Sequence, residues 1–163
     1  GEWVCLGSNT GQLVVLDTRS GAVRTFWQAH EGPVTGLRVR EGGVIVSASS
    51  DRTLAVWNLG SRGLGNTVGA WENAWGNAPK SVWGTGSSTQ ERLFLTDPII
   101  GVAELGGKVV AALGQGVVMA SPPDSVSESR LRSVRSPVTC VGSMPHSRWL
   151  LVGCEDGRVR ACY

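Results

Sequence analysis

Short apolar runs alternate with turn residues throughout positions 30 to 59, and this alternation leaves few folds open to the chain. The runs are Val34–Val39, Val44–Ala48 and Leu54–Leu59, separated by Arg-Glu-Gly-Gly and Ser-Asp-Arg-Thr. Runs of this length between Gly- and Asp-containing turns are typical of strands joined by tight turns. No window here repeats apolar residues at helical spacing. The stretch therefore predicts a β-meander and not a helix.

Polar and aromatic residues recur at fixed places in this meander. His30 precedes the first run, Pro33-Val34-Thr35 opens it, Val-Ser-Ala-Ser-Ser forms the second, Asp51 lies in the next turn, and Trp57-Asn58 ends the third. In this order the stretch resembles a WD40 repeat, the unit of a β-propeller blade. One position departs from the family pattern, because Asn58 replaces the Asp of the Trp-Asp pair. The resemblance implies an all-β fold of antiparallel four-stranded sheets.

The same resemblance implies a role for four side chains. In WD40 repeats a His, a strand Ser or Thr, the turn Asp and the Trp are joined in one hydrogen-bonded chain. These positions correspond here to His30, Ser47, Asp51 and Trp57, with Ser49 as the alternative hydroxyl. Such groups are costly to bury alone and are tolerated as a fully satisfied set. Their expected role is to lock the blade.

A Ser, a His and an Asp this close together could instead form a catalytic triad, and a hydrolase is the enzymatic alternative. We expect the structural role, because these residues stand at the structural positions of the repeat and no second polar cluster offers an oxyanion site. The chain has two histidines and no Cys-x-x-Cys pair, so we expect no metal site and no cofactor. The sequence therefore predicts a protein without catalytic residues.

The rest of the chain divides by the same criteria. Residues 1–59 hold one incomplete blade and the complete one, residues 60–92 are a Gly-, Ser- and Trp-containing insertion, residues 93–135 are a degenerate blade, and residues 136–163 are a final incomplete blade. The expected fold is a partial WD40 β-propeller of about three to four blades. Because the chain begins with Gly and its end units lack a strand, we expect a fragment from the carboxyl-terminal part of a larger protein. The missing blades are expected from the rest of that parent chain.

Composition excludes several classes of partner. The net charge is +2 with 17% charged residues, which is too balanced for a nucleic-acid surface. No apolar run approaches the roughly 18 residues of a membrane helix, and no signal-peptide pattern opens the chain. The four cysteines lack the spacing of a metal site. We expect their thiols to be buried as small apolar side chains in a protein of a reducing compartment. We therefore expect a cytoplasmic location, extending to the periphery of endosomal membranes, with any membrane contact indirect.

The insertion carries Trp71, Trp75 and Trp83. A loop of this length inside a compact domain is uncommon and is usually functional or disordered. Two interpretations stay open. The tryptophans cover their own blade or an exposed edge, or they bind a partner, since Trp is enriched among interface anchors.

A second segment combines serines with basic residues. Ser133 and Ser136 lie among Arg130, Arg132 and Arg135, which is a context for kinase modification. A phosphate would place a charge of roughly −2 beside the arginines. The alternative is an ordinary solvated surface loop.

Function follows from the resemblance alone. WD40 propellers are rigid, non-catalytic platforms for other proteins, so the expected function is a protein–protein interaction scaffold within a larger multidomain protein. The segment RTFWQAHEGPV also resembles the carboxyl-terminal propellers of large BEACH-domain proteins of endosomal and autophagic trafficking. The alternative function is accordingly a membrane- or phosphoinositide-associated propeller of such a trafficking protein.

Overall fold

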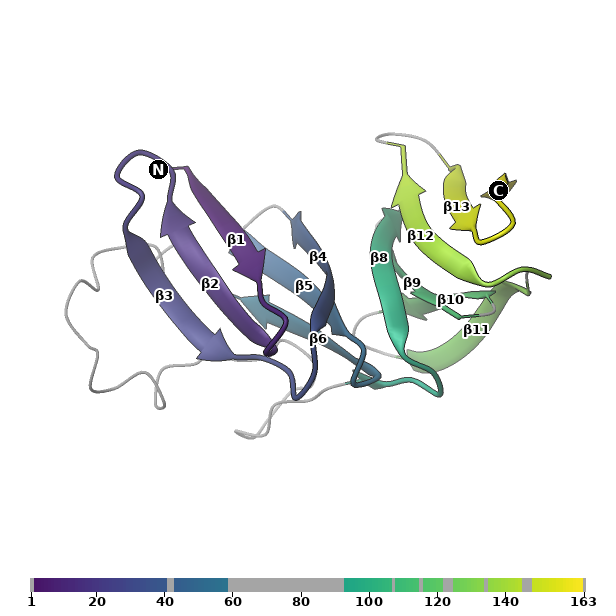
Figure 1. Ribbon diagram of the computed structural model, residues 1–163, viewed down its shortest axis with the longest axis horizontal. Coiled ribbons are helices and arrows are strands. Elements are labelled where there is room, and N and C mark those ends of the chain that lie inside the picture. Colours follow the sequence, from purple (N-terminus) through teal and green to yellow (C-terminus); the bar gives the residue numbers. More distant parts are fainter. Residues whose placement is uncertain are drawn as a thin grey trace.

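The computed structural model describes residues 2–40, 43–58, 93–106, 108–114, 116–121, 125–133, 135–144 and 148–162. The strands form four antiparallel sheets, and within each sheet the strands follow one another in chain order (Figure 1). The first sheet contains β1 (Trp3–Gly7), β2 (Gln12–Asp17) and β3 (Val23–Gln28). The second contains β4 (Val34–Arg40), β5 (Val44–Ser49), β6 (Thr53–Asn58) and β7 (Leu93–Phe94).

The other half of the molecule repeats this organisation. The third sheet contains β8 (Ile99–Leu105), β9 (Lys108–Leu113), β10 (Gly116–Ser121) and β11 (Ser125–Ser133), and the fourth contains β12 (Val138–Ser143), β13 (Leu150–Cys154) and β14 (Val159–Cys162). Figure 1 shows the sheets following one another in chain order from the purple to the yellow end. The all-β prediction of antiparallel sheets is confirmed, although the first and fourth sheets have three described strands and not four.

One predicted boundary is displaced. Leu93 and Phe94 were expected to begin the degenerate blade, but as β7 they pair with Leu54 and Thr53 of β6. They are therefore the outer strand of the second sheet. Along the chain, residues 60–92 therefore come between the third and fourth strands of one sheet and not between two sheets.

Period-two alternation places apolar side chains on both faces of the second sheet. Ile45, Ala55 and Trp57 are buried against the first sheet. Val46, Ala48, Leu54 and Val56 are buried against the third sheet. Successive side chains of a strand point to opposite faces, so these near-continuous apolar runs fill two different cores. This explains why the runs read as uninterrupted in the sequence.

The third sheet follows the same rule. In β9, Val109, Ala111 and Leu113 face the second sheet, whereas Val110 and Ala112 face the fourth. The molecule is therefore a series of sheets stacked face to face, with a separate apolar core between each neighbouring pair.

The first strands of neighbouring sheets approach closely. Thr35 Oγ1 of β4 donates a hydrogen bond to the Ile99 carbonyl of β8 at 2.6 Å, and Arg40 reaches Glu104 of β8 at 2.7 Å. A Cβ at Gly36 would lie 2.8 Å from the backbone nitrogen of Val102, so only glycine allows this approach. These contacts fix the inner edges of the second and third sheets against each other.

Candidate functional site

The candidate site begins at His30, which lies between β3 and β4. Its backbone N–H donates to the Gly11 carbonyl at 3.0 Å, which ties this connection to the first sheet. Its side chain is 0% exposed and lies against the second sheet, close to Ser47 of β5 and Thr53 of β6. The imidazole is thus enclosed where the first and second sheets meet.

A continuous chain of polar contacts passes through this imidazole. Trp57 Nε1 donates to Ser47 Oγ at 2.8 Å, and Ser47 Oγ lies 2.7 Å from His30 Nε2. On the other side of the ring, His30 Nδ1 lies 2.6 Å from Thr53 Oγ1. The Thr53 hydroxyl in turn donates to Asp51 Oδ1. The contacts therefore run from a buried indole to a carboxylate through two hydroxyls and one imidazole.

Counting protons fixes the direction of this chain. Thr53 has a single hydroxyl proton, which it donates in the hydrogen bond to Asp51. The Thr53 oxygen is therefore an acceptor toward His30, and His30 Nδ1–H is the donor. In the neutral imidazole, Nε2 is then an acceptor, and it accepts the Ser47 hydroxyl proton. The Ser47 oxygen accepts the Trp57 N–H. Each donor in this chain thus forms a hydrogen bond to the next group. A buried polar set is tolerable when its members are paired in this way.

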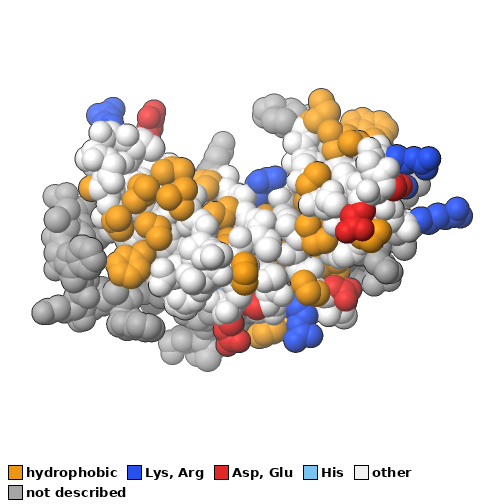
Figure 2. Space-filling view, viewed as in Figure 1, with side chains coloured by type: hydrophobic (Ala, Val, Ile, Leu, Met, Phe, Trp, Pro, Cys, Tyr) orange, Lys and Arg blue, Asp and Glu red, His pale blue; other side chains and the backbone are white. Residues whose placement is uncertain are grey.

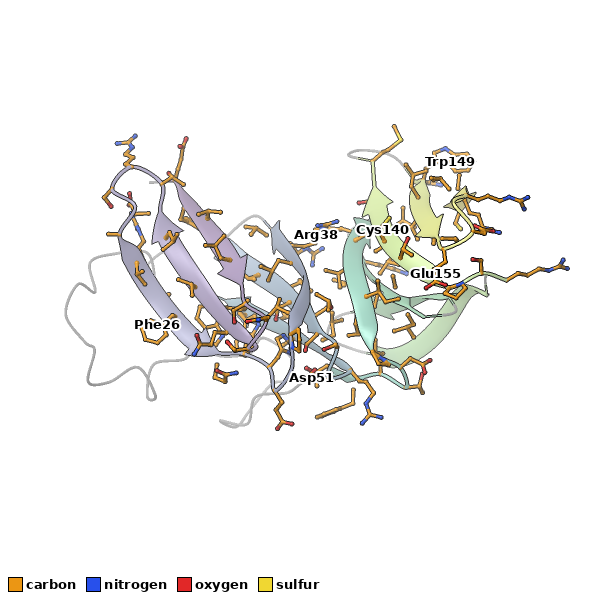
Figure 3. All side chains as sticks on the ribbon, viewed as in Figure 1. Phe26, Arg38, Asp51, Cys140, Trp149 and Glu155 are labelled. Atoms are coloured by element: carbon orange, nitrogen blue, oxygen red, sulfur yellow. The ribbon has the colours of Figure 1, made fainter. Side chains whose placement is uncertain are left out.

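Asp51 lies in the turn between β5 and β6, at the end of the second sheet (Figure 3). Its Oδ2 accepts the Glu31 N–H at 2.8 Å, its Oδ1 accepts the Thr53 N–H at 2.8 Å, and its Oδ2 lies 3.7 Å from His30 Nδ1. Burial of the carboxyl raises its pKa, but the bonds from the Thr53 hydroxyl and from the two backbone N–H groups outweigh it, and the pKa lies below the ordinary value. Asp51 therefore fastens the β5–β6 turn to the β3–β4 connection as an ionised carboxylate.

The structure brings His30, Ser47, Asp51 and Trp57 into one cluster. The alternative hydroxyl, Ser49, lies outside the chain of contacts and accepts the Asp51 backbone N–H at 3.1 Å. Sequence analysis missed Thr53, which stands between the imidazole and the carboxylate. An Asp followed two residues later by a Thr could have pointed to it, because an Asp side chain commonly accepts the N–H two residues on.

The geometry also bears on the catalytic alternative. Ser47 Oγ and His30 Nε2 are at the distance of a nucleophile and its base. However, Ser47 and His30 are both 0% exposed, and the Ser47 oxygen is occupied by the Trp57 N–H. Thr53 also separates the imidazole from Asp51. A substrate cannot reach this serine in the folded chain.

The turns of the end sheets use other side chains. In the first sheet, Ser8 Oγ and Thr10 Oγ1 are hydrogen-bonded to each other at 2.8 Å. In the fourth sheet, the Asp156 N–H donates to Ser136 Oγ at 3.2 Å, and Arg160 donates to the Asp156 carboxylate at 2.8 Å. The hydrogen bond from Arg160 lowers the pKa of Asp156.

These contacts concern one of the two predicted modification sites. A phosphate on Ser136 would place negative charge beside the Asp156 carboxylate, because the Asp156 N–H already donates to the Ser136 hydroxyl. Modification of Ser136 stays a prediction. The side chain of Ser133 lies outside the described residues, as do Trp71, Trp75 and Trp83.

The described part of the chain holds no group of three or more His, Cys, Asp or Glu side chains placed to bind a metal ion. Across the same residues, no helix is long and apolar enough to cross a membrane. The four cysteines, Cys5, Cys140, Cys154 and Cys162, are free thiols. The polar cluster around His30 is therefore the strongest candidate among the described residues.

Comparison with known proteins identifies the repeat. Residues 21–58 and 128–161 match the family described as WD40: WD domain, G-beta repeat. The chain contains WD40 repeats. The first match runs from β3 through β6 and the second from β11 through β14, so each WD40 repeat joins the outer strand of one sheet to three strands of the next. The contacts of Asp51 and His30 lie across such a junction.

Curated relatives cover almost the whole chain. It is 30% identical over 165 aligned residues to WD repeat-containing protein 81 of Homo sapiens, covering 98% of this chain. It is 27% identical over 163 residues to Protein GFS12 of Arabidopsis thaliana, covering 99% of this chain. The chain spans 7% of the length of the human relative and 10% of the Arabidopsis one.

A solved structure shows the same fold. The β-propeller domain of Myceliophteria thermophila Cps50 (Swd1) superposes with a TM-score of 0.71 at 17% identity, covering 98% of this chain and 47% of that one. The four sheets therefore have the fold of part of a β-propeller, as the sequence predicted.

Proposed function

We propose that this WD40 chain is a non-catalytic platform that binds other proteins as part of a larger multidomain protein. The observation that carries the proposal is that the polar groups of the His30 cluster are hydrogen-bonded to one another. Its hydroxyls, imidazole and carboxylate are engaged with one another where two sheets join, and Ser47 and His30 are fully buried. The groups that could do chemistry thus hold the framework together. The WD40 propeller fold is itself generally non-catalytic, and such propellers generally mediate interactions with other proteins.

Tryptophan residues supply material for binding. Trp149 is 46% exposed and precedes β13 at the outer end of the fourth sheet (Figure 3). The insertion adds Trp71, Trp75 and Trp83 between β6 and β7. Trp is enriched at interface hot spots because one side chain buries a large area while keeping a hydrogen-bond donor. We assign the main partner-binding role to the insertion, because it brings three tryptophans into one segment.

Proximity labelling in cells tests this function. The baits are the whole chain, a variant with Trp71, Trp75 and Trp83 all changed to Ala, and Trp149→Ala as a matched loss of an exposed tryptophan elsewhere. We expect a specific set of proteins that is lost with the triple variant and kept with Trp149→Ala. If the whole chain labels only what an unfused labelling enzyme labels, the platform function is wrong.

The membrane-associated trafficking alternative is suggested by Arg130, Arg132 and Arg135, together with the tryptophan-bearing insertion. Among Arg130, Arg132 and Arg135, the described side chain is that of Arg135, which is exposed. Attraction of basic residues to anionic lipid is worth roughly 1 kcal/mol per residue near the surface. Flotation with vesicles that contain or lack phosphoinositide checks it. The alternative requires that the whole chain floats with phosphoinositide-containing vesicles and that this flotation is lost when the three arginines are changed to Ala. The cytoplasmic location likewise stays a prediction.

A further inference from the structure

The turn between β13 and β14 in the fourth sheet is built like the Asp51 turn of the second sheet. In each turn, the residue before the Asp donates its backbone N–H to a proline carbonyl in the connection that precedes the first strand of the sheet. The pairs are Ser50 with Pro33 at 3.1 Å and Glu155, labelled in Figure 3, with Pro137 at 2.9 Å. The carboxylates of Asp51 and Asp156 each accept the backbone N–H two residues on. The two Asp residues therefore occupy equivalent positions.

The backbone N–H of the turn Asp has a different acceptor in the two sheets. Asp51 donates it to Ser49 Oγ at 3.1 Å, at the end of its own strand β5. Cys154 ends β13 at the equivalent place, two residues before Asp156. Asp156 donates its N–H at 3.2 Å to Ser136 Oγ, which lies in the connection between β11 and β12. In the fourth sheet, a hydroxyl from this connection thus replaces the strand serine.

The carboxylates of the two turns also hold different partners. Asp51 Oδ2 accepts the Glu31 N–H of the β3–β4 connection at 2.8 Å, whereas Asp156 Oδ2 accepts a hydrogen bond from Arg160 of β14 at 2.8 Å. The second of these carboxylates is therefore engaged within its own sheet. Among the described residues, the side chain that joins the β13–β14 turn to its connection is that of Ser136.

Ser136 is placed where a protein kinase can reach it. Its side chain is partly exposed, and those of Arg135 and Pro137 on either side are exposed. The residue lies in a connection at the end of the sheet, and not on a sheet face that an adjoining blade would cover. A serine followed by a proline is the pair that proline-directed kinases modify. Figure 2 shows basic side chains next to acidic ones on the part of the molecule that carries the fourth sheet.

We propose that Ser136 is a phosphorylation site and that its phosphate releases the β13–β14 turn from the β11–β12 connection. A protein kinase transfers the γ-phosphoryl group of ATP to Ser136 Oγ. A bond from Oγ to the γ-phosphorus forms, the bond from that phosphorus to the bridging oxygen of the leaving ADP breaks, and the hydroxyl proton passes to the base of the kinase. This inference does not rest on the platform function.

Two effects of the phosphate act in the same direction. Ser136 Oγ accepts the Asp156 N–H, so a group of roughly −2 charge lies close to the Asp156 carboxylate and repels it. Arg160 is shared between the two anions, and any hydrogen bond that it forms to the phosphate is lost from Asp156. Both effects weaken the contacts that hold the turn. Modification of one hydroxyl thereby controls the attachment of the fourth sheet to its connection.

Phosphorylation of the whole chain tests the site. The chain is incubated with a proline-directed serine kinase and ATP, and the modified residues are located by mass spectrometry. Ser121 is the other serine followed by a proline, but it ends β10 and pairs with Ser125, so we expect the phosphate on Ser136 first. Ser136→Ala must lose this phosphate. A folded chain that stays unmodified at Ser136 overturns the proposal.

Amide hydrogen exchange tests the release. The phosphorylated and unmodified chains are compared over peptides that cover residues 155–157. We expect exchange to be several-fold faster with the phosphate, because the N–H groups of Glu155 and Asp156 lose their acceptors. The Asp51 turn is the internal control, and its exchange stays unchanged. Ser136→Ala removes the acceptor without adding charge, so it should accelerate exchange less than the phosphate does.

Asp156→Asn tests the repulsion itself. Asn keeps the backbone N–H but not the negative charge, so phosphorylation of Ser136 should accelerate exchange less in this background than in the wild type. Circular dichroism must show the β-sheet spectrum for this variant, and Asp156→Ala replaces it if the protein does not fold. Exchange that is unchanged or slower in the phosphorylated wild type overturns the proposal, as does an equal acceleration with and without the Asp156 carboxylate.

Discussion

The contribution of Thr53 can be measured by Thr53→Val, which replaces its hydroxyl by a methyl of similar size. His30 Nδ1–H then loses its acceptor in a site where the imidazole is 0% exposed. An unsatisfied buried donor costs about 1–3 kcal/mol. Asp51 loses less, because its carboxylate keeps the Glu31 and Thr53 backbone N–H groups and its side chain is 12% exposed to water.

The free energy of unfolding of Thr53→Val should therefore be about 1–2 kcal/mol lower than that of the wild type, since burial of the new methyl offsets less than about 1 kcal/mol. Urea unfolding followed by far-ultraviolet circular dichroism measures it. With a slope of about 1–3 kcal/mol per molar urea, the midpoint falls by roughly 0.3–2 M. All samples need one protein concentration, because association changes apparent stability.

A double-mutant cycle identifies the partner. In a His30→Leu background there is no imidazole donor to leave unsatisfied, so Thr53→Val should cost little stability. The coupling free energy between the two changes should be about 1–2 kcal/mol. The directional chain of hydrogen bonds is refuted if Thr53→Val stays within about 0.5 kcal/mol of the wild type or costs the same in both backgrounds.

Three further outcomes follow from the same structure. The pKa of folded Asp51 lies below its ordinary value of 3.8, so the ionised carboxylate stabilises the fold above that pH and loses this effect as the pH falls through the folded pKa. The difference in free energy of unfolding between the wild type and Asp51→Asn should therefore narrow below about pH 4, which unfolding at a series of pH values measures. Mass spectrometry after brief alkylation should find Cys140 modified before Cys154 and Cys162, because Cys140 is exposed and the other two are buried; equal labelling of folded protein would contradict their placement. Gly11→Ala should destabilise by more than about 1 kcal/mol in urea unfolding, because Gly11 has a φ of +84° and a Cβ there would lie 2.1 Å from the His30 carbonyl oxygen.

Strand positions were predictable because the information is local. The apolar runs predicted between residues 34 and 59 correspond to β4, β5 and β6 within one or two residues at each end. The Asp51 turn marks the boundary of β5 and β6, since a turn Asp ends an apolar run. Period two and turn composition act over a few residues and need no knowledge of the partner sheet.

The polar cluster was predictable only in part. The repeat pattern names His30, Ser47, Asp51 and Trp57, but a Thr two residues after an Asp has the same local signature whether it faces solvent or a core. Thr53 meets the imidazole because β6 packs beside the connection that carries His30. That contact joins residues 23 positions apart and belongs to the packing of two sheets.

The sequence by itself determined the β-meanders, their turns and most of the residues that lock the second sheet, because side-chain alternation and turn chemistry are properties of neighbouring residues. Only the tertiary structure decided that β7 returns to the second sheet after the insertion, and which face of each sheet is covered. Strand pairing across a long insertion depends on closure entropy and on the edge available, neither of which is written in a local pattern. The first sheet shows the same limit, because the buried Leu13 and Val15 and the exposed Val4 and Leu6 follow the same alternation, and the difference lies in what packs against each face.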